Sequence, residues 1–402
     1  MLAFVKKIRS RLRTHGFGYF ALLMRNEISQ PRFRATRHMR SLLILTHQLR
    51  YRRSQDAASR SDDCLQFCYD LSTSPITFDF ASYLAAAEIE RRLRGFKNID
   101  VIFVMGPHAG VREESPDYEA VVSREARLWR VRHMLVPMLA FLPTVQSFAV
   151  CATREQADVL ISKDPRRIYP SDYRVFLPRP PDKRVIHDHA RAGVPIWPMF
   201  RATEHSRKLI REFLERDVKG RRPLVITLRN YGYTPQRNSR NADWLAFANS
   251  LDLTRYAPIF IHDSETVMQR PPADFSKHIT FDAASVNLEI RMALYEAAWL
   301  NMALMAGPTE LCWYNEQARY LFFIAVGSAA VQTREALIRN GHRVGFDLDF
   351  AKPYQRIVWS VDEFDTLRRE FLAMEALLDG LPLRTDLHPA LGKEFSQNDS
   401  VS

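Results

Sequence analysis

The sequence predicts an α/β protein with two doubly wound, Rossmann-like domains behind a basic helical N-terminal extension. In both halves of the chain, short buried runs typical of strands alternate with amphipathic runs typical of helices. This alternation indicates parallel sheets with crossover helices. A length of 402 residues suits two domains. The excess positive charge lies in one N-terminal segment, which sets that segment apart from the rest.

The basic extension is defined by charge and by amphipathic spacing. Residues 1–60 contain 14 lysines and arginines but two acids, so they carry a net charge of +12, whereas the remaining chain is close to neutral at −1. Apolar clusters at 17–24 and 41–49 alternate with basic residues, as in helices that lie on anionic lipid. A helical extension packed on the body or on a partner, with a solvated basic face, explains the pattern equally well. Because the body is neutral, no nucleic-acid partner is expected.

Several absences point to the cytoplasm. The basic N-terminus is not followed by an apolar segment with a small-residue cleavage site, so we expect no signal peptide. No run of 18 apolar residues suggests a spanning helix. Four cysteines are too few for a disulfide scaffold and suit thiols in a reducing compartment. We therefore expect a cytoplasmic protein, located at the inner face of the membrane if residues 1–60 bind lipid.

The first half begins with a predicted β-α-β unit. Residues 74–79 fit a short buried strand, and 81–93 have helical apolar spacing that ends at Gly95. The β-branched run 99–105 predicts the second strand, which Gly106-Pro107 closes.

A proline-rich region separates the two halves. Residues 165–200 are rich in proline, arginine and aromatic residues, and a predicted helix follows at 204–217. We predict an extension at 1–65, an N-terminal domain at 66–200, a C-terminal domain at 201–380 and a polar tail at 381–402.

The second half is more regular. Its strands are predicted at 223–228, 257–261, 278–281, 301–306 and 320–325. Its helices are predicted at 243–251, 288–300, 309–315 and 361–378. This alternation predicts a second doubly wound sheet, in which ligands bind at the carboxyl ends of the strands.

The loop after strand 223–228 is the strongest candidate for a ligand site. Residues 229–241 contain three arginines and three asparagines. Arg229 and Arg237 could bind phosphate in a bidentate manner, and Asn238 and Ser239 could bind phosphate or ribose oxygens. A solvent-exposed polar loop is the alternative.

Two further strand ends supply candidates. Asp263 follows strand 257–261 and could contact a ribose or base, or it could cap its own loop. Strand 301–306 leads into a turn where glycine permits close backbone approach and helix-start N–H groups favour anions. The candidates in this turn are Gly307, Pro308, Thr309 and Glu310. A plain strand–turn–helix connection is the alternative.

A carboxylate and two first-half residues complete the candidate set. On helix 288–300 we favour Glu296 as the residue that points into the cleft. His108 and Asp79 follow predicted first-half strands and are candidate general bases, although a structural role suits either. The sequence contains none of the common dinucleotide, P-loop or zinc motifs and no paired-aspartate motif, so we expect no cofactor and no metal site.

These features together resemble a known family. Arg229, the Arg237–Ser239 stretch, Trp244, Glu296 and Gly307-Pro308 are similar to positions in bacterial GT-B glycosyltransferase-like proteins, which are distantly related to the fucosyltransferase superfamily. The resemblance covers about 160 residues of the second half and, by general layout, the first half. It implies that the C-terminal domain holds a nucleotide sugar and that Arg229 or Arg237 contacts the diphosphate.

The resemblance implies a metal-independent glycosyltransferase. The donor would be a nucleotide-diphosphate sugar, and the acceptor a glycan or a lipid-linked molecule near the basic extension. His108 or Asp79 would deprotonate the acceptor hydroxyl. A GT-B-shaped sugar-nucleotide epimerase and a non-catalytic nucleotide- or glycan-binding module are the alternatives.

Overall fold

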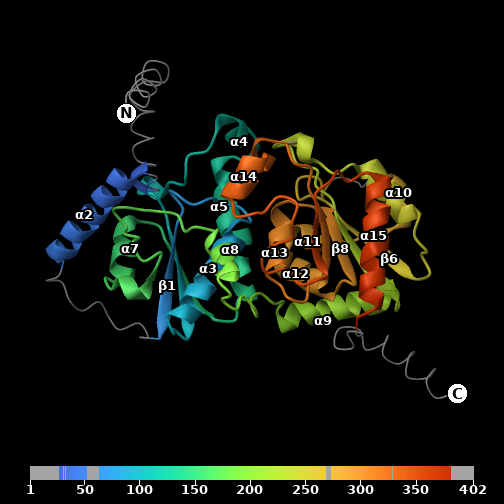
Figure 1. The fold of residues 1–402 in the computed structure, drawn as a ribbon, viewed down its shortest axis with the longest axis horizontal. Coiled ribbons are helices and arrows are strands. Elements are labelled where there is room, and N and C mark those ends of the chain that lie inside the picture. The colour runs from blue at the N-terminus through green and yellow to red at the C-terminus, as the bar shows by residue number, and fades with distance from the viewer. Residues whose placement is uncertain are drawn as a thin grey trace. The chain divides into compact units, whose positions relative to one another are not determined.

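The chain forms two compact units, each assembled from separated segments (Figure 1). The computed structural model describes residues 27–29, 31, 33–51, 63–268, 273–327 and 329–381. The first unit contains the described residues up to Pro75, together with 90–114 and 144–182. The second contains 76–89, 115–143 and the described residues from Lys183 onward. Most of the basic extension, and the polar tail beyond Leu381, lie outside the described residues.

The first unit is built on a four-stranded parallel sheet in the order β3-β2-β1-β4. Its strands are β1 (Cys64–Asp70), β2 (Asn98–Val104), β3 (Val145–Cys151) and β4 (Ile168–Tyr169). One face is covered by α7 (Arg154–Leu160), whose Ala157 shares a core with Cys68 and Ile102. Helix α2 (Arg34–Tyr51) also belongs to this unit.

The predicted strand at 74–79 is wrong. These residues form turns and bends, in which the backbone N–H groups of Thr73 and Ser74 donate to the Asp70 carbonyl oxygen. The strand is instead β1, which is completely buried. Because β1 contains no β-branched residue and no polar alternation, its sequence gave little strand signal. The predicted helix and second strand are confirmed as α3 (Phe80–Leu93) and β2.

The second unit holds a six-stranded parallel sheet in the order β10-β9-β8-β5-β6-β7. Its strands are β5 (Arg222–Thr227), β6 (Tyr256–Ile261), β7 (Ile279–Thr280), β8 (Leu300–Leu304), β9 (Tyr320–Phe323) and β10 (Gln355–Val358). Counted from β5, this is the strand order 3-2-1-4-5-6 of the dinucleotide-binding fold. The prediction of two doubly wound parallel sheets is confirmed, and β10 is an additional strand that was not predicted.

Helices cover both faces of this sheet. On one face α10 and α15 bury Trp244, Phe247 and Phe371 against the strands, while α12 packs against β5 and α9 on the other. The longer helices are α9 (Glu204–Phe213), α10 (Asn241–Asn249), α12 (Leu288–Ala297) and α15 (Phe364–Asp379). The shorter ones are α4 (Pro116–Val121), α5 (Arg124–Arg130), α6 (Val136–Met138), α8 (Val185–Arg191), α11 (Ala283–Val286), α13 (Glu310–Trp313) and α14 (Arg334–Arg339).

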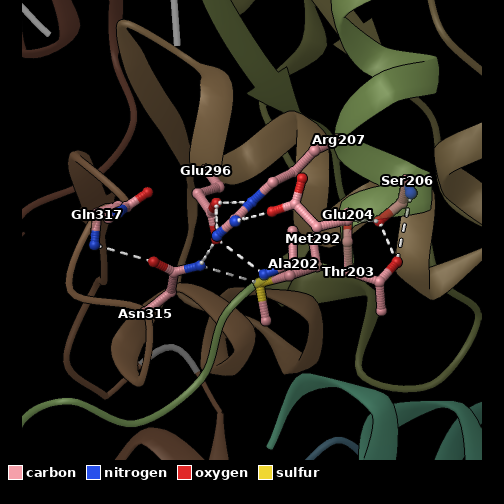
Figure 2. A network of polar contacts seen from close by, with 9 residues as sticks. All are labelled: Ala202, Thr203, Glu204, Ser206, Arg207, Met292, Glu296, Asn315 and Gln317. Carbon is pink, nitrogen blue, oxygen red and sulfur yellow. Dashed lines mark hydrogen bonds and ion pairs between the residues drawn. The ribbon is translucent and has the colours of Figure 1, made fainter. Parts of the chain in front are cut away.

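A buried carboxylate ties three segments of the second unit together (Figure 2). Glu296 on α12 is 1% exposed. Its oxygens accept hydrogen bonds from the Ala202 backbone N–H at 2.8 Å, the Arg207 guanidinium of α9 at 2.6 Å and the Asn315 amide at 2.7 Å. A buried charge is tolerated when it is paired and fully hydrogen-bonded in this way. Glu296 therefore holds α9, α12 and the segment after α13 in register.

We predict that Glu296→Ala destabilises the protein by about 2–4 kcal/mol, because the buried N–H donors of Ala202 and Asn315 lose their acceptor and the half-buried Arg207 is left with its exposed partner Glu204. Glu296→Gln keeps the shape and should cost less. The free energy of unfolding from urea titrations tests this. Glu204→Ala is the control, since Glu204 bonds the same arginine from an exposed position. Equal losses for Glu296→Ala and Glu204→Ala would contradict the structural role.

Candidate functional site

The topology of the second sheet selects one place for a ligand. The strand order reverses between β5 and its neighbour β8, and ligands of such sheets bind beyond the carboxyl ends of the strands at this switch point. The loop 228–240 follows β5, and the turn 305–309 follows β8. The two strongest sequence candidates therefore flank the same switch point.

Arg229 closes its own loop. Its guanidinium donates to the backbone oxygens of Tyr233 and Thr234, at 2.6 and 3.1 Å, and to the side chain of Asn238. Its backbone N–H donates to the Ser239 hydroxyl at 2.8 Å. Arg229, Asn238 and Ser239 thus shape the loop from within, and the predicted phosphate contacts of these three residues would require them to exchange protein partners.

Arg237 is held differently. One of its terminal nitrogens donates to the Met305 backbone oxygen at 3.1 Å, so the arginine bridges the loop after β5 to the end of β8. Its Nε is buried and has no hydrogen-bond partner among the described residues. Burial and the nearby charge of Arg229 lower the pKa of Arg237 to about 10, which leaves the side chain cationic at neutral pH. An unsatisfied donor on a half-buried cation is expensive unless an anion binds there.

The turn after β8 is packed so tightly that it requires glycine. A Cβ atom on Gly307 would lie 2.8 Å from the ring of Phe78. This close approach fixes the segment that carries Asp79 against the turn that carries Glu310. Within the turn, the Thr309 hydroxyl donates to the Ala306 carbonyl at 2.6 Å. It is therefore already used by the protein, and Pro308 begins the short helical turn as predicted.

Asp79 and Glu310 form the centre of a buried polar cluster. Asp79 accepts from the Lys183 ammonium and from the Thr77 hydroxyl, each at 2.7 Å. Glu310 accepts from the Ser82 hydroxyl at 2.7 Å, and Ser82 in turn accepts from the Tyr314 hydroxyl at 2.8 Å. The negative charge of Asp79 also acts on Arg237 and raises the pKa of its guanidinium in part. Three predicted site residues, Arg237, Asp79 and Glu310, therefore lie near one another. Lys183, Ser82 and Tyr314, which were not predicted, complete the cluster.

The pKa values of the two carboxyl groups are shifted in opposite directions. Burial and the charge of Asp79 raise the pKa of Glu310 to about 8. Burial alone would raise the pKa of Asp79, but the Lys183 charge and the hydrogen bonds from Lys183, Thr77 and Glu310 lower it well below its usual range. Asp79 is therefore the stronger acid of the two, and Glu310 is the one that holds a proton to higher pH. Paired groups with separated pKa values are typical of sites that handle protons.

The remaining candidates occupy other places. Asp263 accepts from the Asn230 backbone N–H at 3.3 Å, which links the loops after β5 and β6. Glu296 is enclosed in the structural network described above. The histidine, cysteine and acidic side chains of the described residues nowhere gather in a group of three or more suited to a metal ion.

His108 belongs to the first unit, whereas Asp79 belongs to the second. His108 is exposed and has a left-handed backbone, with φ of 55°. It lies at the tip of a tight loop whose ends, Gly106 and Gly110, exchange backbone hydrogen bonds. Its predicted role as a base stays a prediction.

Sequence analysis missed Lys183, Ser82 and Tyr314. Lys183 lies within the proline-rich region that was assigned to a domain connection, and Ser82 lies in the first turn of α3. Neither position belongs to a motif or follows a strand. An ion pair between residues 104 positions apart leaves no mark on the local sequence.

We predict that Glu310→Gln flattens the pH dependence of stability between about pH 5 and 8. The raised pKa means that folded wild type binds a proton that the unfolded chain has released, so wild-type stability falls as pH rises through this range. Glutamine mimics the protonated acid and cannot titrate. Urea unfolding at several pH values measures the difference, with Glu335→Gln on an exposed part of α14 as control. Parallel curves for wild type and Glu310→Gln would contradict the assignment.

Comparison with known proteins gives matches in fold only. No protein-family model and no curated protein matches the chain. Its fold is similar to that of a glycosyl transferase family 9 protein from Veillonella parvula, at 9% identity and a TM-score of 0.45 over 82% of this chain and 93% of that one.

Two other solved structures are similar to it as well. The ADP-heptose lps heptosyltransferase II of E. coli matches at 10% identity and a TM-score of 0.39, over 78% of this chain and 98% of that one. Fucosyltransferase NodZ from Bradyrhizobium matches at 12% identity and a TM-score of 0.27, over 61% and 91%. All three are glycosyltransferases by name, and each likeness to this chain is one of fold alone.

Proposed function

We propose that this protein transfers a sugar from a nucleotide-diphosphate donor to a glycan or lipid-linked acceptor without a metal ion. The observation that carries the proposal is Arg237, a cation at the switch point of a dinucleotide-binding sheet with a buried donor that no described residue satisfies. A diphosphate supplies both the charge and the acceptor oxygens that this side chain lacks.

In this mechanism Arg237 stabilises the leaving diphosphate. Negative charge grows on the diphosphate as the bond to the sugar breaks, and a preoriented guanidinium offsets that charge more effectively than water does. The segment after β8 lies beside the same place, because Arg237 donates to the Met305 backbone oxygen. Arg229 acts indirectly, because its bonds within the loop keep Arg237 in position.

The carboxyl cluster would contact the transferred sugar or the acceptor. Lys183 stabilises the anion of Asp79, which favours Asp79 as a hydrogen-bond acceptor for a sugar hydroxyl over Asp79 as a strong base. The raised pKa of Glu310 suits a proton donor. His108 remains the candidate that removes the proton from the acceptor.

The first experiment is a thermal-shift and calorimetric screen of GDP, UDP, ADP and TDP, extended to ADP-heptose and GDP-fucose. These two nucleotide sugars are named in structures of heptosyltransferase TibC and of NodZ, respectively. A ligand that binds the folded protein raises its stability by about 2.7 kcal/mol at 100 times the Kd. If none of these compounds shifts the melting temperature, the proposed donor class is wrong.

We predict that Arg237→Ala weakens binding of the best nucleotide by about 10- to 100-fold, through loss of charged hydrogen bonds to phosphate. The matched control is Arg240→Ala. Arg240 lies in the same loop and has the same charge, but it is exposed and bonds Asp243. If both variants bind alike, Arg237 is not the phosphate ligand.

Turnover separates a transferase from the alternatives. Slow release of nucleoside diphosphate from the bound donor, accelerated by an acceptor, is expected of a transferase. Interconversion of the sugar without release would indicate an epimerase, and tight binding with neither reaction would indicate a non-catalytic module.

A further inference from the structure

Helix α2 is attached to the first unit through a polar side. Arg40 is 2% exposed, and its guanidinium donates to the Asp172 carboxylate at 3.3 Å and to the backbone oxygens of Asp172 and Leu177 at 2.9 and 3.2 Å. A further bond reaches the Ile28 carbonyl at 3.1 Å. Thr36 and Ile44 lie one turn on either side of Arg40, and both are partly buried. The side of α2 that faces the protein therefore follows the spacing 36, 40 and 44.

The rest of the α2 surface carries exposed apolar side chains, with His38 and Thr46 exposed among them. Leu42 is 62% exposed and Leu45 51%, and Met39 and Leu43 are also exposed. Met39 lies three and four residues before Leu42 and Leu43, so these side chains are neighbours on the helix surface. A surface helix normally turns such residues toward the core, whereas α2 turns them away from it. We call Met39, Leu42, Leu43 and Leu45 the outer face.

The charge of α2 indicates what covers the outer face. Helix α2 contains no acidic residue, and the exposed Arg37 and Arg34 lie about one and two turns before Leu42, respectively. The surrounding segment, residues 1–60, carries +12. A second copy of the helix would bring like charges together, which disfavours self-association through this face. An apolar face bordered by arginines is complementary to a bilayer that presents phosphate groups above acyl chains.

We propose that the outer face of α2 binds the surface of an anionic lipid bilayer, independently of the function proposed above. The leucines and Met39 enter the boundary between headgroups and acyl chains, and Arg34 and Arg37 contact lipid phosphates. Association at the surface is the relevant mode, since no helix among the described residues is long and apolar enough to cross a membrane.

The test is sedimentation of the full chain with vesicles. Vesicles of phosphatidylcholine mixed with phosphatidylglycerol should bind the protein at least about tenfold more strongly than vesicles of phosphatidylcholine alone, and high salt should weaken binding. Similar binding to the two kinds of vesicle would overturn the electrostatic part of the proposal.

Variants distinguish binding through the outer face from nonspecific binding to vesicles. Leu42→Glu/Leu45→Glu should weaken binding to anionic vesicles by about 100-fold, because two apolar side chains lose their burial and two negative charges are added. Arg34→Ala/Arg37→Ala should weaken it by about 25-fold. Leu372→Glu, at a half-exposed leucine on α15, is the matched control and should bind as wild type does.

Two results would overturn the proposal. The first is unchanged vesicle binding by Leu42→Glu/Leu45→Glu when circular dichroism shows it folded. The second is a wild-type dimer in light scattering that the same variant converts to a monomer, which would make a second copy of the chain the occupant of the outer face.

Discussion

The half-buried ion pair between Asp79 and Lys183, with the buried Glu310 beside it, links the distant segments that build the candidate site of the second unit. It joins segments from three distant parts of the chain, and each segment belongs to the second unit although only one follows a strand of its sheet. Each charge offsets part of the desolvation cost of partly burying the other. The pairing therefore selects the arrangement in which residues 76–89 and 183 lie against the turn after β8.

The buried Glu296 and the half-buried Arg237 have contrasting surroundings. The contrast indicates a structural role for Glu296 and a ligand-binding role for Arg237. Glu296 has its oxygens occupied by the backbone N–H of Ala202, by Arg207 and by Asn315. Arg237 bonds one carbonyl oxygen and keeps a buried nitrogen unsatisfied. Other buried polar atoms of the described residues also lack a partner, and Arg237 differs from them in its place at the switch point of the sheet. Helix α2 presents a similar case, because its exposed leucines and Met39 have no apolar surface packed against them among the described residues.

Sequence patterns succeeded where a local rule governs structure. The β-branched run of β2, the apolar spacing of α12 and the polar loop after β5 were each visible because neighbouring residues carry the signal. β1 was missed, since a strand buried on both faces shows no alternation and this one lacks β-branched residues. The charge of residues 1–60 was equally visible, but the direction in which α2 turns its leucines was not.

The sequence by itself determined the alternation of strands and helices, the separation of the basic extension from a neutral body, and the loops at which a ligand could bind. The tertiary structure decided which arginine is available, because Arg229 and Arg237 look equivalent until the partners of each guanidinium are known. It also decided that Lys183 pairs with Asp79 and that burial beside Asp79 raises the pKa of Glu310. The physical reason is that burial, charge pairing and hydrogen-bond satisfaction depend on atoms far apart in the chain, whereas periodicity and propensity depend on neighbours.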